Sequence, residues 1–251
     1  MDEIIFSNHE LLFVFYHIEK CAGSSLRIIL FNFFKTFIKP GRIFIPEFNK
    51  NKTLNLTNKA YTKIQSKGPE YIHFLSKIKV ILCHITKNDP GFSLRSRFEI
   101  TVLRNPISRA ISHYNFFGRS HYSNKDFDKL SDNEFDHYMR SSGNVMTWRL
   151  SGNIGNLELA KRNLMNMTHV LIVETFDTDV EVLEYKLNKY FFKNYKFKTV
   201  HRNKQKGKPK KVYSNEFIDR MIQYIKLDIE LYMFFIRLRY NFKKIISSYF
   251  K

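Results

Sequence analysis

Short apolar runs alternate with segments of helical periodicity along most of the chain, and this alternation limits the folds open to it. The first run, residues 11–18, is rich in Leu, Phe and Val, which is typical of a strand covered on both faces. Further strands are expected at residues 79–85, 98–103 and 169–173. Strands that alternate with helices form βαβ units. The sequence therefore predicts an α/β fold with a mainly parallel central sheet flanked by helices.

The remaining segments divide into expected helices and expected loops. We expect helices at residues 26–38, 106–117, 156–166 and 179–190, and a long last helix capped by Ser214. Residues 39–69 and 118–132 are expected to be mostly irregular, and the basic stretch 201–211 is expected to be a loop. Because 251 residues can bury one sizeable core and no internal repeat is visible, we expect residues 1–251 to form a single domain.

The formal net charge of +19 is large for this length. It fits an anionic ligand, an acidic polymer or a membrane surface, and it fits equally a composition that is merely rich in lysine. Cys21 and Cys83 are too few for a disulfide framework or a zinc cluster. The first residues lack a basic region, and no apolar run reaches the length of a membrane span. We therefore expect a cytoplasmic protein without stable membrane insertion.

A lysine and a group of small residues, Lys20-Cys-Ala-Gly-Ser-Ser25, follow the first expected strand. Ligands of parallel sheets bind at the carboxyl ends of the strands. Small residues let backbone N–H groups approach an anion, and the next helix offers its positive N-terminus. Lys20 adds a charge, and Ser24 and Ser25 add hydroxyl donors. The segment predicts a phosphate-binding loop, with an ordinary turn and a solvated lysine as the alternative. In the Walker motif the lysine comes last, not first, which argues against an ordinary ATPase or GTPase.

A similar arrangement follows the strand expected at residues 98–103. Arg104 ends that strand, Asn105 can cap the next helix and Pro106 suits its first position. Arg104 and Ser112 could together hold a second phosphate, since the planar guanidinium binds phosphate oxygens in pairs. A plain helix start with surface charges is the alternative. Two anion sites on neighbouring strand ends would suit one ligand that carries two separated phosphates.

These segments resemble the motifs of the PAPS-dependent sulfotransferases of the family-2 type, which includes the heparan and chondroitin carbohydrate sulfotransferases (PAPS is 3′-phosphoadenosine 5′-phosphosulfate). His17-Ile-Glu-Lys-Cys-Ala-Gly-Ser-Ser-Leu26 is similar to the family's H-I-P-K-T-G-G-T-S-L. Residues 103–114, LRNPISRAISHY, are similar to L-R-D-P-V-x-R-x-x-S-x-Y. Weaker similarities follow in the expected order, in NVMTWRLSG, VLIVETFD and DIELY.

The resemblance implies a P-loop-like three-layer sandwich that forms a single sulfotransferase domain. It implies that the 5′-phosphosulfate of PAPS is held by Lys20 and by the backbone and hydroxyls of Cys21, Ala22, Gly23, Ser24 and Ser25. Arg104 and Ser112 would hold the 3′-phosphate, and the basic loop 202–211 would close over the cofactor. The product would be PAP, the desulfated nucleotide, and no metal is required.

Sulfuryl transfer needs alignment of acceptor and leaving group, and neutralisation of charge on the oxygens. Lys20 would stabilise the leaving phosphate as its bond to sulfur breaks. The resemblance implies that His84 is the general base for a carbohydrate hydroxyl, with Cys83 where the family has glycine. His17 is the second candidate for the base, and we expect His113 not to reach the acceptor.

Two residues depart from the family pattern, and other functions remain open. Glu19 stands at the usual proline position and would repel phosphosulfate unless it points away, and Cys21 removes a threonine hydroxyl. The main alternative is a non-catalytic basic protein of the same fold that binds acidic glycan or nucleic acid, although no nucleic-acid-binding signature is present. A nucleotide kinase is the third reading, against which the missing Gly-Lys-Ser/Thr counts. The net charge of +19 would also suit an acidic carbohydrate acceptor.

Overall fold

The computed structural model describes residues 11–39, 42–44, 78–84, 87, 96–198 and 211–249, without the side chains of Cys83 and residues 242–249. The chain forms two units that alternate along the sequence. The first, here the sheet unit, comprises residues 1–17, 22–102 and 167–203. The second, here the helical unit, comprises residues 18–21, 103–166 and 204–251. That residues 1–251 act as a single domain stays a prediction.

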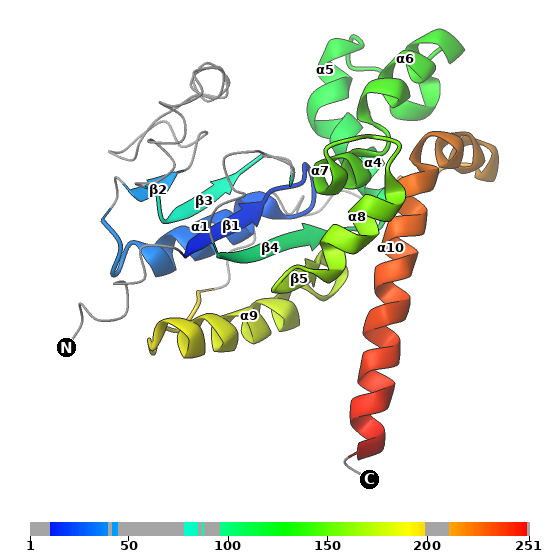
Figure 1. Cartoon of the computed structure of the whole chain (residues 1–251). Helices are drawn as coiled ribbons and strands as arrows, with labels where there is room; N and C mark the ends of the chain where they lie inside the picture. Colours follow the sequence, from blue (N-terminus) through cyan, green and yellow to red (C-terminus); the bar gives the residue numbers. More distant parts are fainter. Residues whose placement is uncertain are drawn as a thin grey trace. The chain divides into compact units, whose positions relative to one another are not determined.

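The sheet unit is built on five strands in the order β2-β3-β1-β4-β5 (Figure 1). The strands are β1 (Leu12–Tyr16), β2 (Ile43–Phe44), β3 (Val80–Cys83), β4 (Arg97–Leu103) and β5 (His169–Ile172). β1 pairs in parallel with both β3 and β4, and β2 pairs in parallel with β3. The predicted α/β fold with a parallel sheet is thereby confirmed, whereas its three-layer, P-loop-like form stays a prediction.

β1 lies at the centre of this sheet, and all five of its residues are buried. The strands that follow it in the sequence, β2 and β3, lie on one side of it, and β4 lies on the other. The strand order therefore reverses beside β1, which is the place where ligands bind in open parallel sheets. The segments after β1 and after β4 thus lie where a ligand of such a sheet would bind.

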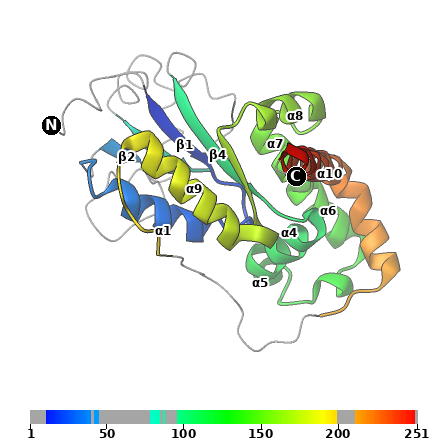
Figure 2. The ribbon, with the colours of Figure 1, turned by 90° about the horizontal axis from the view of Figure 1, so that it is seen from below.

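Two helices cover one face of the sheet, α1 (Gly23–Phe34) and α9 (Phe176–Phe191) (Figure 2). Phe13 of β1 contacts Phe34, with ring centroids 4.6 Å apart, and Phe34 meets Phe191 edge to face at 5.5 Å. Phe33 joins this aromatic layer and is fully buried. The apolar face that each helix shows in the sequence is thus explained by packing on the strands and on the other helix.

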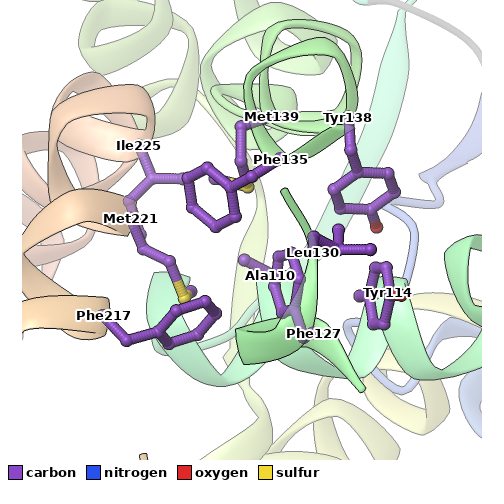
Figure 3. Packing of buried hydrophobic residues seen from close by; sticks show 10 residues of the cluster. All are labelled: Ala110, Tyr114, Phe127, Leu130, Phe135, Tyr138, Met139, Phe217, Met221 and Ile225. Carbon is purple, nitrogen blue, oxygen red and sulfur yellow. The ribbon is translucent and has the colours of Figure 1, made fainter. Parts of the chain in front are cut away.

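Apart from residues 18–21, the helical unit follows β4 in the sequence. Its elements are α4 (Pro106–His113), the π-helical turn η4 (Tyr114–Gly118), α5 (Arg119–His121), the 3₁₀ turn η5 (Phe127–Lys129), α6 (Asp132–Ser142), α7 (Val145–Ser151), α8 (Leu157–Met165) and α10 (Asn215–Tyr249). α4, α6 and α10 share one apolar core (Figure 3). Its buried members are Ala110, Tyr114, Phe127, Leu130, Phe135, Tyr138, Met139, Phe217, Met221 and Ile225.

Several helices start at side chains that cap them. Asn105 accepts a hydrogen bond from the Ser108 N–H at 3.1 Å, and Ser214 accepts one from the Phe217 N–H at 3.2 Å. Both caps agree with the sequence-based expectation. α10 does not run straight, because Ile225 has non-helical backbone angles and separates two helical parts. Within the described part of the chain, no helix is long and apolar enough to cross a membrane.

Some elements differ from the prediction. β2 lies in the stretch 39–69 that was expected to be irregular, and most of that stretch is outside the described residues, as is 201–210. α6 and α7 were not predicted. The signal for α6 was present, because Ser131 and Glu134 form a reciprocal capping box. α1 begins at Gly23, three residues before the expected start, and ends at Phe34.

Candidate functional site

The turn between β1 and α1 has an unusual backbone. Lys20 and Ala22 both have positive φ angles, 65° and 54°, which non-glycine residues rarely adopt. Ala22 is the N-cap of α1, and no side chain caps that helix start. Such backbone conformations cost about 1–3 kcal/mol each and are concentrated at ligand-binding segments. The turn therefore has the kind of backbone that P-loops and other ligand-binding segments use, and its binding of an anion stays a prediction.

Gly23, the first residue of α1, allows a close approach that no other residue would. A Cβ atom on Gly23 would lie 1.7 Å from Cδ2 of His17. The His17 ring is buried, at 5% exposure, and also stacks on Phe15 with centroids 5.6 Å apart. The absence of a side chain at Gly23 thus leaves room for the His17 imidazole. Because His17 is enclosed in this way, it is poorly placed to receive a proton from an acceptor.

His84 lies just after β3, and the same unit holds its ring. Nδ1 of His84 is 2.7 Å from the carbonyl oxygen of His17, and the two imidazoles stack with centroids 3.9 Å apart. A carbonyl oxygen only accepts hydrogen bonds, so Nδ1 carries the proton in this contact. The neutral ring then has its lone pair on Nε2, which is the form that a general base requires.

Lys20 and Arg104 come together in the helical unit. Arg104 donates a hydrogen bond from Nη1 to the carbonyl oxygen of Lys20 at 3.0 Å. Lys20 places Nζ 3.9 Å from the ring centroid of Phe116, on the π-helical turn η4. Burial, and next the charge of Arg104, lower the pKa of Lys20 below its usual value. Two neighbouring cations favour the binding of an anion, which would relieve their repulsion.

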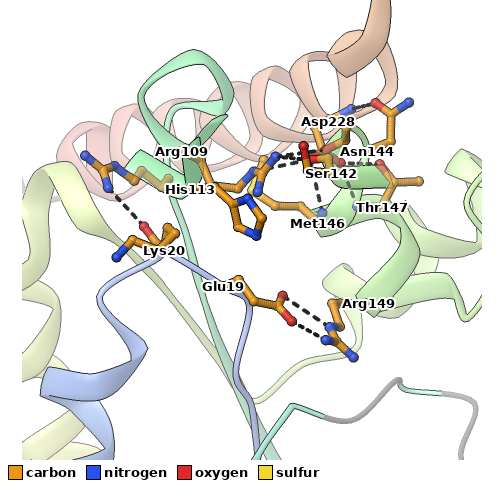
Figure 4. Close-up of polar contacts among 12 residues, drawn as sticks. Glu19, Lys20, Arg109, His113, Ser142, Asn144, Met146, Thr147, Arg149 and Asp228 are labelled. Carbon is orange, nitrogen blue, oxygen red and sulfur yellow. Dashed lines mark hydrogen bonds and ion pairs between the residues drawn. The ribbon is translucent and has the colours of Figure 1, made fainter. Parts of the chain in front are cut away.

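Glu19, the residue before Lys20, pairs with a different cation. Its carboxylate forms an ion pair with Arg149 of α7, in which Nε of Arg149 is 3.3 Å from Oε2 of Glu19 and Nη2 contacts Oε1. Figure 4 shows that the side chains of Glu19 and Lys20 point to different sides of the turn. Glu19 therefore points away from Lys20 (Figure 4), as phosphosulfate binding would require, and that binding itself stays a prediction.

Cys21, Ser25 and Ser112 are further residues of the predicted site. Burial raises the pKa of the Cys21 thiol to about 12, so it is not a nucleophile. The backbone N–H groups of Cys21 and Ser25 donate within the turn, to the carbonyl oxygens of Ile18 and Ala22. Ser112 is half-buried on α4. That these residues contact phosphate stays a prediction.

Arg109 belongs to a buried polar cluster that sequence reasoning missed. Its side chain is fully buried, and Nη2 donates to the carbonyl oxygens of Ser142 and Gly143 at 2.6 and 2.9 Å. Nε lies 3.9 Å from the carboxylate of Asp228 on α10. The cluster thus joins α4 to the segment between α6 and α7 and to α10 (Figure 4).

Asp228 caps α7 from another helix. Its carboxylate accepts from the N–H groups of Met146 and Thr147 at 3.1 and 2.8 Å, and from the Thr147 hydroxyl at 2.9 Å. In return, Asn144 accepts from the N–H of Asp228 at 3.1 Å, in the second part of α10. The segments NVMTWRLSG and DIELY therefore contact one another, and their polar residues hold the helical unit together.

His113 lies beside Arg109 (Figure 4), and its imidazole is neutral at pH 7. Its Nδ1 is 2.5 Å from the Tyr138 hydroxyl, and Figure 4 shows its ring beside Arg109. Burial and then the Arg109 charge lower the pKa of His113 to about 4. At neutral pH it therefore adds no charge to the site.

A scan of the sequence against models of protein families finds no match, and a search of curated proteins finds none.

Proposed function

We propose that the chain is a PAPS-dependent sulfotransferase whose sheet unit is the core of a P-loop-like fold. In this proposal the sulfuryl group passes to a hydroxyl of a carbohydrate acceptor. The observation that carries the proposal is the pair of cations, Lys20 and Arg104, in the segments after β1 and β4, together with the ion pair that draws the Glu19 carboxylate to Arg149. Ligands of parallel sheets bind at such strand ends.

PAPS would supply an activated sulfuryl group on one phosphate and a second phosphate on its ribose. Lys20, with the backbone and hydroxyls from Cys21 to Ser25, would hold the phosphosulfate and neutralise charge on the leaving phosphate. Arg104, with Ser112, would hold the 3′-phosphate through paired donors. The residues present fit this nucleotide in charge, since the turn and the start of α4 offer cations and hydroxyls.

His84 would act as the general base on the acceptor hydroxyl. Support comes from its hydrogen bond to the His17 carbonyl, which fixes the proton on Nδ1 and the lone pair on Nε2. The stacked His17 ring restricts rotation of His84, so the base is pre-oriented. Since His17 is itself buried, His84 is the better candidate of the two.

Calorimetric titration with PAP, ADP and ATP tests the proposal. We expect PAP to bind more tightly than ADP and ATP. Lys20→Ala should weaken PAP binding by about 10- to 100-fold, the effect of losing one charge-assisted hydrogen bond of about 1.5–3 kcal/mol. Lys189→Ala, which removes an exposed lysine of α9, is the matched control and should leave PAP affinity unchanged.

A lack of preference for PAP would overturn the proposal. Equal and strongly salt-dependent binding of all three nucleotides would then favour the alternative, a basic protein that binds acidic glycan or nucleic acid. Turnover of ATP that depends on Mg²⁺ would instead favour a nucleotide kinase.

A further inference from the structure

A groove of about 440 Å³ opens on the helical unit. It is lined by Ser141, Val145, Trp148, Gly152, Asn153 and Ile154, from the end of α6, from α7 and from the segment after it. The volume lies in the range of small-molecule sites. None of the six lining residues carries a charge, although the chain has a net charge of +19. The groove therefore suits a neutral ligand.

Trp148 gives this groove an aromatic wall whose position is fixed by neighbours. The guanidinium of Arg149 stacks on the indole, with Cζ 4.3 Å from the ring centroid. Arg149 is in turn held by its ion pair with Glu19. A fixed indole is a good stacking surface for the apolar C–H face of a pyranose ring, because little conformational entropy is lost on binding.

Two polar side chains of the groove offer complementary hydrogen-bonding groups. The hydroxyl of Ser141 donates to the Tyr138 carbonyl oxygen at 2.8 Å, so its oxygen keeps lone pairs that can accept. Oδ1 of Asn153 accepts from the Gly155 N–H at 3.1 Å, which orients the amide and leaves its NH₂ group as the donor. A sugar hydroxyl both donates and accepts, so neighbouring hydroxyls can satisfy such a pair.

We propose that the groove binds a neutral sugar ring, stacked on Trp148 and hydrogen-bonded by Ser141 and Asn153. One side chain, Arg149, contacts both Trp148 and Glu19, and Glu19 directly precedes Lys20. The sugar site is thereby joined to the loop that would hold the sulfuryl donor. The binding of a sugar in the groove is independent of the proposed function. The further claim that this sugar is part of the acceptor rests on the proposed function.

The chain contains a single tryptophan, so its fluorescence reports on this groove alone. The purified protein is titrated with cellobiose and with N,N′-diacetylchitobiose, each to tens of millimolar, about the range of a weak single-ring site. We expect a saturable change in Trp148 emission with at least one of them. Ser141→Ala and Asn153→Ala should each weaken it about 3- to 10-fold, as for one lost hydrogen bond. Ser120→Ala, an exposed serine outside the groove, is the control and should have no effect.

Acrylamide quenching of the same protein shows whether the indole is accessible. Accessible indole without a response to either sugar, or indole that acrylamide does not reach, overturns the sugar site. A response that neither groove variant changes also overturns it. PAP titration of the same protein separates the two proposals. Sugar binding without PAP binding would support the sugar site but contradict its role as the acceptor site. PAP binding without sugar binding would support only the sulfotransferase proposal.

Discussion

Glu19 and Lys20 are neighbours in the sequence, yet their charges serve different partners. Glu19 pairs with Arg149, and Lys20 lies on Phe116 beside Arg104. In the proposed function the ion pair would favour anion binding, because it draws the Glu19 carboxylate to Arg149.

Arg149→Ala tests this role of the ion pair. Without its partner, Glu19 would place a full negative charge beside the loop, and we expect PAP affinity to fall about fivefold, for a charge interaction of about 1 kcal/mol. Adding Glu19→Gln to the same protein should restore the affinity, which calorimetry can measure. Failure of the second substitution to restore binding would show that Arg149 contributes in another way.

His84→Ala should leave PAP affinity unchanged and lower turnover about 10²- to 10⁴-fold, the usual contribution of a general base. Transfer of labelled sulfate from PAPS to a carbohydrate acceptor would measure this. A variant that retains full turnover would assign the proton transfer elsewhere, first to His17.

The pKa of His113 predicts a pH effect on stability. Its pKa is about 4 in the folded chain and 6.5 ordinarily, so the unfolded chain binds more protons between these values. Stability is fully present above pH 6.5 and is lost as the pH falls toward 4, by up to about 3 kcal/mol. Urea unfolding of wild type and His113→Gln at pH 7 and pH 4.5 measures the difference. An equal pH dependence of both proteins would contradict the assigned pKa.

At the residue scale, the sequence could indicate chemistry but not all of the geometry. The lysine, the small residues and Arg104 could be singled out because these residue types suit phosphate binding at strand ends, a role that stays a prediction. The positive φ of Lys20 and the burial of Arg109 were not recognisable. Both arise from contacts between segments far apart in the sequence, which a local pattern does not encode.

At the scale of secondary structure, α4, α7 and α10 depend on one buried carboxylate. Asp228 faces the fully buried Arg109 and supplies the N-terminal cap of α7. Burial raises the pKa of Asp228, whereas Arg109 and the N–H groups of α7 oppose this increase. Removing the carboxylate would leave a buried guanidinium and two helical N–H groups with fewer partners.

Asp228→Ala should therefore lower the free energy of unfolding by about 3–5 kcal/mol, the usual effect of breaking a buried ion pair. Denaturant unfolding measures it. Asp219→Ala, at an exposed position of the same helix, should change stability by less than about 1 kcal/mol. A similar decrease in the free energy of unfolding in the two variants would show that Asp228 does not hold the three helices together.

The elements that the sequence predicted well are those with strong local patterns. β1, β3, β4 and β5 are short apolar runs, and α4 and α10 have the expected caps. β2 has only two residues and exists through its pairing with β3, so no local period reveals it. α7 has seven residues and is capped by Asp228, which is more than 80 positions away in the sequence.

At the scale of the whole molecule, charge and strand order point to the same place. The net charge of +19 alone does not locate a site. The reversal of strand order beside β1 does locate one. Lys20 and Arg104 follow β1 and β4, which are neighbouring parallel strands at this place. The arrangement of the sheet, more than the total charge, thus supports the proposal of a nucleotide ligand.

The most direct test of this account is a thermodynamic cycle on the 3′-phosphate. PAP and AMP differ only in that phosphate, and their affinities are measured by calorimetry for wild type and for Arg104→Gln. Arg162→Gln, an exposed arginine of α8, is the control. We predict that wild type and Arg162→Gln prefer PAP over AMP and that Arg104→Gln reduces this preference at least about tenfold, for a charge-assisted contact. A preference for PAP that Arg104→Gln leaves unchanged would contradict the assignment of Arg104, and the absence of any preference for PAP in wild type would contradict the sulfotransferase proposal.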